Sequence, residues 1–339
     1  MLSKLIGVFD DSPADVRGAI LGLYALLAAG NLLVWALALR AFHGFPALMG
    51  TAVLAYCLGL RHAVDADHIA AIDNVTRKLM QAGKRPVSTG FYFSLGHSTV
   101  VFLASLAIAA GAAGLESRFP RLQAVGGVVG TCVSAGFMLL IAFLNIAILR
   151  DLHRAFKNVR EGGAEESGAL EELLKRRGLL GRFFRGAYGL IGRAWHMYPL
   201  GFLFGLGFDT ATEIGLLGIT ALEAAKGLPA WSILLFPALF AAGMCLVDAS
   251  DGVLALAAYG WAFVKPARKL YYNLTVTFVS ALSALLVGGL EILGLLTGRL
   301  NGDLGAMGWL IIAVLALSWL ASTAIYKLEG HDELDAEKS

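Results

Sequence analysis

Apolar residues dominate long stretches of this chain, and short polar or charged segments separate them. A helix needs about 20 apolar residues to cross the hydrocarbon core of a bilayer. Eight stretches reach that length, at about 18–39, 46–73, 87–112, 123–149, 197–222, 229–264, 269–297 and 305–326. The pattern predicts an all-α integral membrane protein with about eight transmembrane helices, and residues 1–339 form one polytopic membrane domain.

The amino-acid composition is typical of a membrane protein, and the motifs that the sequence lacks exclude some classes of membrane protein. The chain is 58% hydrophobic and 15% charged, with a mean hydropathy of +0.71, which is far from a soluble globular profile. Three aspartates precede the first stretch, whereas a cleaved signal peptide has a positively charged segment there. The sequence shows no P-loop, dinucleotide fingerprint or nucleic-acid motif. These absences argue against an ATP-driven pump within this chain, and we expect no ATPase subunit and no nucleic acid as partners.

Lysine and arginine are concentrated in alternate connections, which predicts the orientation in the membrane. The basic connections follow the second, fourth and sixth spans: Arg77, Lys78, Lys84 and Arg85, then Arg150 through Arg193, then Lys265, Arg268 and Lys269. We therefore expect these connections and both termini to be cytoplasmic. The longest of them, 150–196, is interpreted as a solvated cytoplasmic loop, and 327–339 as a cytoplasmic tail.

Four polar clusters interrupt the apolar spans. They are Arg61 to His68 in the second span, Gly96 to Thr99 in the third, Gly207 to Glu213 in the fifth and Gly243 to Gly252 in the sixth. Ionisable groups at membrane depth cost about 2.5–3.5 kcal/mol each on insertion scales, so they usually face a cavity and serve a function. Histidine and carboxylate are also ligands that first-row divalent metals accept. A transported metal ion, held within the bilayer, would explain all four clusters.

The first cluster carries the most metal-capable atoms. On a regular helix the side chains of His62, Asp67 and His68 point in widely separated directions. They meet at one ion only if the helix is broken or unwound near them, which Gly59 would permit. Broken helices that line a cavity build ion sites in many transporters. Simple i,i+4 ion pairs, Arg61 with Asp65 and Asp73 with Arg77, are the alternative explanation for the charges here.

The fifth and sixth spans each place two carboxylates on one helix face. Asp209 and Glu213 are four residues apart, and Asp248 and Asp251 are three apart. At about 1.5 Å per residue, Asp209 falls near the level of His97 at the midplane, and Asp248 lies nearer the cytoplasm. We interpret these carboxylates, with Thr210, as residues that line the ion pathway or couple transport to its driving force.

The same clusters suggest an internal repeat. Spans two to four and five to seven each open with a motif after Leu-Gly, at Gly59 and Gly207, and continue with a Gly-led motif, at Gly96 and Gly243. Three is odd, so the second set would cross the membrane in the opposite sense. We therefore expect three-helix inverted repeats.

The four motifs together resemble the nickel/cobalt transporter family (NiCoT) of bacterial and fungal membranes. The family's second-span signature, RHA-hydrophobic-DADHI, reads unbroken from Arg61 to Ile69. The third-span element matches Leu95 to Val101, and the fifth-span element matches Leu206 to Glu213. The sixth-span element matches Gly243 to Asp251, except that Ala249 replaces a threonine.

This resemblance implies an eight-span permease of the cytoplasmic membrane that takes up Ni²⁺, with or without Co²⁺, without ATP. The metal would be a transported substrate, with no cofactor and no enzymatic activity. The family's binding residues map onto His62, Asp67 and His68, supported by His97. Asn31 matches a first-span position implicated in the family. We add Asp65 to the metal set because it lies three residues after His62.

Two alternatives compete with uptake. Efflux of a metal or another cation could use the same kind of helix bundle, although exporters often carry a His-rich soluble loop, and 150–196 holds only His153 and His196. A membrane acyltransferase shares the spacing His62-x4-Asp67, where the aspartate would orient a histidine base. Such enzymes also need a Gly-rich phosphate-binding element, which this sequence does not supply.

Overall fold

A computed structural model describes residues 7–110, 119–160, 191–206, 211–262 and 266–297, with residues 313, 314 and 317. The described part of the chain is helical and contains no strand. Its first half contains α2 (Val16–Phe42), α3 (Pro46–His62), α4 (Ala66–Gln81), α5 (Thr89–Ala109) and α6 (Phe119–Arg160). Its second half contains η1 (Ala194–His196), α9 (Met197–Gly205), α10 (Ala211–Ala225), α11 (Ala230–Ile233), α12 (Leu235–Ala262) and α13 (Pro266–Thr297).

Five helical stretches of the described chain are long and apolar enough to cross a membrane, which agrees with the predicted class. They are Val16–Phe42, Thr89–Ala109, Gly127–Ala147, Ala230–Gly260 and Thr277–Thr297. The bent pair of α3 and α4 could form a sixth. The predicted eighth span, the tail 327–339 and the centre of the 150–196 loop lie outside the described residues, apart from positions 313, 314 and 317. The predicted fifth span, 197–222, is not among these stretches: its described residues form the two shorter helices α9 and α10. The count of eight therefore stays a prediction.

The apolar stretch 46–73 is not one straight helix. Its two helices, α3 and α4, meet at an angle of 52°. Tight hydrogen bonds from the Val64 and Asp65 amides to the carbonyls of Arg61 and His62 close the turn between them. Asp65 then takes an extended backbone, with ψ of 146°, and is the N-cap of α4, which begins at Ala66. The interruption lies after His62, whereas Gly59, where we expected flexibility, is helical within α3.

Gly59 serves close packing instead. A Cβ at Gly59 would overlap the carbonyl of Phe240 in α12, and a Cβ at Gly243 would meet the carbonyl of Tyr56 at 2.8 Å. The helices α3 and α12 therefore touch backbone to backbone through one glycine from each. Small residues permit this approach between membrane helices, where dispersion contacts replace the hydrophobic effect as the source of attraction.

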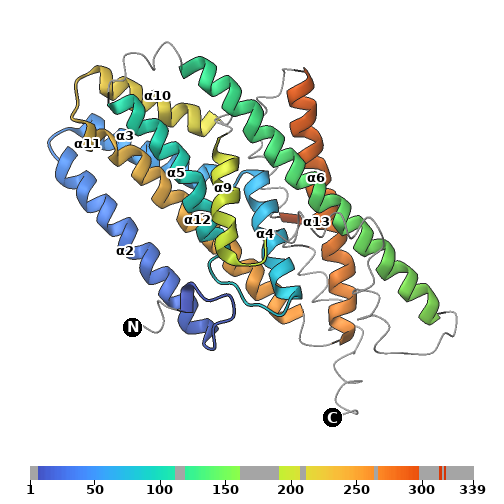
Figure 1. Cartoon of the computed structure of the whole chain (residues 1–339). Coiled ribbons are helices and arrows are strands. Elements are labelled where there is room, and N and C mark those ends of the chain that lie inside the picture. Colours follow the sequence, from blue (N-terminus) through green and yellow to red (C-terminus); the bar gives the residue numbers. More distant parts are fainter. Residues whose placement is uncertain are drawn as a thin grey trace.

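The same relation recurs between α9 and α5. A Cβ at Gly201 would overlap the carbonyl of Phe93, and a Cβ at Gly96 would overlap the carbonyl of Tyr198. In both helix pairs the touching carbonyl belongs to the residue three positions before the partner glycine. The four helices α3, α12, α5 and α9 thus form the packed centre of the bundle, while α6 and α13 cross each other to one side (Figure 1).

A buried polar network fastens α4 to that outer helix pair. Arg77 is only 2% exposed, and its guanidinium donates hydrogen bonds to Asn74, to Asn145 of α6 and to Thr277 of α13. Asp73, one turn earlier, accepts hydrogen bonds from Tyr259 of α12 and Ser280 of α13. Asp73 and Arg77 are thus held by separate partners from three other helices, and the expected i,i+4 ion pair between them is not among the contacts of the described residues.

Three segments predicted to share one side of the membrane meet at the same end of the bundle. The carboxylate of Asp11 accepts hydrogen bonds from the amide of Ala194 and from Lys84. Lys84 also donates to the carbonyl of Gly192, and Lys78 donates to the carbonyl of Ile191. The N-terminal segment, the connection after α4 and the approach to α9 are therefore held together at this end.

Candidate metal centre

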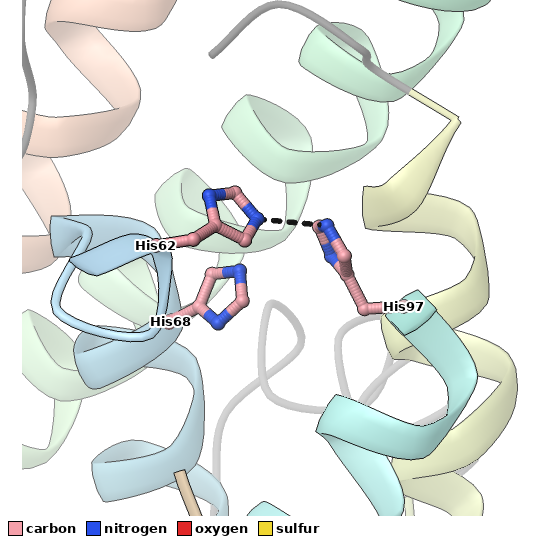
Figure 2. A group of neighbouring side chains, drawn as sticks. All are labelled: His62, His68 and His97. Carbon is pink, nitrogen blue, oxygen red and sulfur yellow. Dashed lines mark hydrogen bonds between the residues drawn. The ribbon is translucent and has the colours of Figure 1, made fainter. Parts of the chain in front are cut away.

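Three histidines from different helices converge in the middle of the bundle. His62 ends α3, His68 lies in the first turn of α4 and His97 lies midway along α5. Nitrogen atoms of all three lie within 4.8 Å of one another, and the three side chains point into one space (Figure 2). His62 is 1% exposed, His68 0% and His97 3%. The interruption after His62 makes this possible, because it brings two residues onto one site that a continuous helix would point apart.

His62 is fixed by hydrogen bonds to both ring nitrogens. Its Nδ1 lies 3.0 Å from Oδ2 of Asp65, and its Nε2 lies 2.9 Å from Nε2 of His97. The other oxygen of Asp65 accepts a hydrogen bond from Arg61 at 2.6 Å. Arg61 and Asp65 are therefore an ion pair as predicted from their spacing, and that pair also orients His62. A carboxylate on one nitrogen of a histidine is a common arrangement behind metal ligands.

His68 is held in the same way by a residue far along the sequence. Its Nδ1 lies 3.2 Å from Oδ2 of Asp248 in α12, and both side chains are fully buried. Its Nε2 is buried and has no hydrogen-bond partner in the described structure. A buried nitrogen without a partner is costly unless a ligand satisfies it. The orphaned Nε2 therefore fits a metal-binding atom.

Glu213 enters the group from α10. Its Oε1 lies 2.8 Å from Nε2 of His97 and 3.9 Å from Nε2 of His62. The carboxylate is 1% exposed. The sequence placed Glu213 on the pathway beside Asp209, whereas the structure places it against the histidines. Asp209 and Thr210 lie outside the described residues.

Apolar rings enclose the histidines. The ring centroids of Phe93 and His68 are 4.8 Å apart, and those of Phe240 and His62 are 5.5 Å apart. Both phenylalanines are 0% exposed. Sequence reasoning did not single out these rings, because a phenylalanine in an apolar span carries no signal of its own.

The remaining predicted residues lie around this group rather than in it. Asn31 donates to the carbonyl of Leu27 and accepts a hydrogen bond from Tyr56, so it joins α2 to α3. Asp67 is partly exposed in the first turn of α4. Asp251 lies one turn after Asp248, and its Oδ2 has no hydrogen-bond partner in the described structure.

The donor set is chemically specific. Three imidazoles with a carboxylate among them suit first-row divalent metals, whereas Mg²⁺ and Ca²⁺ prefer oxygen ligands alone. The acyltransferase alternative would have Asp67 orient His62, but the carboxylate that hydrogen-bonds His62 is Asp65.

Comparisons with known proteins agree with this chemistry. Residues 48–325 match the NicO family, described as "High-affinity nickel-transport protein". The "High-affinity nickel transport protein" of Cupriavidus necator is 52% identical over 98% of this chain and 99% of its own length. The "Hydrogenase nickel incorporation protein HupN" of Bradyrhizobium diazoefficiens is 49% identical over 90% of this chain and 83% of its own.

The "Cobalt transport protein NhlF" of Rhodococcus rhodochrous is 39% identical over 90% of each chain. No solved structure matches this chain. The extent of these matches and the long apolar helices together identify a multi-pass membrane protein that belongs to the NicO family of high-affinity nickel-transport proteins.

Proposed function

We propose that this protein takes up Ni²⁺ across the cytoplasmic membrane as a secondary permease, with Co²⁺ as a second substrate. The observation that carries the proposal is the buried group of His62, His68 and His97, whose nitrogens lie within 4.8 Å of one another inside an apolar bundle. Relatives named for nickel transport and one named for cobalt transport support the choice of metals. Imidazole and carboxylate ligands accept both ions.

The ligands we propose are Nε2 of each histidine and Oε1 of Glu213. Donor atoms at about 2.0–2.1 Å from a metal stand roughly 2.9–3.4 Å apart in octahedral or tetrahedral sites. The contacts from His97 to His62 at 2.9 Å and to Glu213 at 2.8 Å are close to this spacing. The orphaned Nε2 of His68 supplies a further ligand after a small movement.

Charge also favours a divalent cation. The negative charge of Asp65 is offset by Arg61, with which it forms an ion pair. Glu213 and Asp248 remain beside the histidines as two carboxylates, which together match the charge of Ni²⁺. A buried charge is expensive unless it is paired, so bound metal stabilises this arrangement.

The other predicted residues take supporting roles in this proposal. Asp65 and Asp248 orient His62 and His68 through their Nδ1 atoms. Asp209, Thr210 and Asp251 belong to the pathway, and Asp67 lies at its edge. Asn31 acts from the first span through Tyr56, which donates a hydrogen bond to it.

We further propose eight spans with both termini in the cytoplasm, and two inverted three-helix repeats. The glycine contacts support the repeats and supply their register: Gly59 of α3 corresponds to Gly201 of α9, and Gly96 of α5 corresponds to Gly243 of α12. The second correspondence is the one expected from the motifs. The first differs, because Gly59 was expected to match Gly207.

The uptake proposal is tested with ⁶³Ni²⁺ in cells that express the protein. We expect cellular ⁶³Ni²⁺ to rise on expression, and Co²⁺ to compete more strongly than Mn²⁺. His62→Ala and Glu213→Gln should abolish uptake at normal expression. His43→Ala is the matched control, because His43 is an exposed histidine at the end of α2. Uptake like the parent in His62→Ala would refute the site, and a fall in cellular nickel on expression would indicate export.

A further inference from the structure

The candidate metal centre is closed on two sides by aromatic rings. Phe240 packs on His62 with ring centroids 5.5 Å apart, and Phe93 packs edge-on against His68 at 4.8 Å. Phe93 also approaches His97, at 6.3 Å between centroids. Both rings are 0% exposed and the histidines are almost fully buried, so an ion bound among them is enclosed by these side chains.

The two rings occupy corresponding positions in the two halves of the bundle. Phe93 lies three residues before Gly96, and Phe240 lies three residues before Gly243. The carbonyl of each phenylalanine is the atom against which the partner glycine packs, Gly201 for Phe93 and Gly59 for Phe240. The register of the glycine contacts therefore relates Phe93 to Phe240 independently of any motif.

The two phenylalanines lie at different levels along the bundle. Phe93 lies one turn before His97, toward the end of α5 that follows the basic connection with Lys84. Phe240 lies in the second turn of α12, eight residues before Asp248. Gly90, near the start of α5, packs against the carbonyl of Asp248, whereas His62 lies between Phe240, earlier in α12, and His97, later in α5. The helix α12 therefore runs antiparallel to α5. Phe240 is thus displaced by about 12 Å along α12 from Asp248, toward the end opposite the basic connection.

We propose that Phe240 and Phe93 are the outer and inner gates of the metal pathway, which open one at a time. This inference rests on the proposed uptake function and names the residues that control access to its site. An aromatic ring packed against the ligands blocks a hydrated ion sterically and excludes water from them. Phe240 and His62 belong to different repeats, so movement of one repeat against the other would separate them. Phe93 and His68 belong to the same repeat, so their separation takes a movement of α5 relative to α4.

The test measures how fast bound ⁶³Ni²⁺ is lost to an impermeant chelator on each side of the membrane. Right-side-out and inside-out vesicles loaded with ⁶³Ni²⁺ expose the outer and the cytoplasmic face, respectively, to EDTA. Phe240→Ala should lose bound ion about tenfold faster than the parent from the outer face only, because an open route mainly raises the dissociation rate. Phe93→Ala should do so from the cytoplasmic face only.

Phe236→Ala is the matched control. Phe236 is equally buried and lies one turn before Phe240 in α12, but its ring stacks on Phe42 at 5.4 Å. It should release ⁶³Ni²⁺ like the parent. If an alanine variant does not reach the membrane, Phe240→Leu and Phe93→Leu replace it and should show a smaller acceleration on the same side.

The possible results distinguish failure of the gate proposal from failure of the proposed uptake function. A parent protein that holds no ⁶³Ni²⁺ would refute the proposed function, and the gates with it. A parent that holds ⁶³Ni²⁺, with variants that release it at the parent's rate or equally fast from both faces, would refute the gates alone.

Discussion

Nε2 of His62 lies 2.9 Å from Nε2 of His97, although the two residues are 35 positions apart. One of these nitrogens must carry a proton and the other must accept it. Oε1 of Glu213 also lies 2.8 Å from Nε2 of His97 and, as a carboxylate, can only accept. We therefore place the proton on Nε2 of His97, and the lone pair on Nε2 of His62. This is the arrangement without metal: Nε2 of His62 is free to bind Ni²⁺, whereas Nε2 of His97 must give up its proton before it can serve as the ligand proposed above.

The first prediction tests Nε2 of His97 as a ligand. The amide of glutamine extends to about the position of Nε2, whereas that of asparagine reaches only the position of Nδ1. We expect His97→Gln to bind Ni²⁺ at least about tenfold more tightly than His97→Asn, a difference of about 1.4 kcal/mol. Isothermal titration of the purified protein measures both affinities. Equal affinities, or a preference for asparagine, would mean that Nε2 is not the ligand atom.

The second prediction concerns Asp248 as the residue that orients His68. Loss of a carboxylate behind a histidine ligand typically lowers metal affinity about 10–100-fold. We expect Asp248→Ala to show a loss of this size and Asp248→Asn a smaller one, because its amide oxygen still accepts from Nδ1. Asp15→Ala is the control, since Asp15 caps α2 away from the histidines. Unchanged Ni²⁺ affinity in Asp248→Ala would remove Asp248 from the site.

Sequence patterns predicted the helical class and most span positions, because long apolar runs permit little else in a bilayer. They also singled out His62, His68 and His97, although their meeting depends on a turn whose place was not predicted. The break was expected at Gly59 and lies after His62, because Gly59 instead packs against Phe240.

The sequence did not predict which side chains on different helices contact each other. Asp248 lies 180 residues from His68, and Glu213 lies 116 residues from His97. Spacing along one helix says which neighbours share a face, but not which other helix that face meets. This is why Glu213 was assigned to the pathway with Asp209 rather than to the histidines.

The third prediction concerns the polar network around Arg77. Asn145 accepts a hydrogen bond from the buried guanidinium at 2.7 Å and donates to Asn74. A hydrogen bond to a charged group contributes about 1.5–3 kcal/mol, so Asn145→Leu should lower the free energy of unfolding by about that amount. Thermal denaturation in detergent measures the change. Phe143→Leu, at a 55% exposed position of the same helix, should leave stability unchanged. A melting temperature like the parent's in Asn145→Leu would mean that the network adds no stability.

The last prediction tests the repeat through its packing. A Cβ at Gly59 or at Gly201 would overlap the carbonyl of the phenylalanine that it faces. Overpacking typically costs about 1–3 kcal/mol, so Gly59→Ala and Gly201→Ala should destabilise the protein by similar amounts and slow uptake. Gly50→Ala and Gly218→Ala are the controls, because a Cβ at either position meets nothing within 4 Å. These controls should match or exceed the parent in stability, since alanine favours helix over glycine. If only one of the two packed glycines is sensitive, the two helix pairs are not equivalent, and the proposed register of the inverted repeats is wrong.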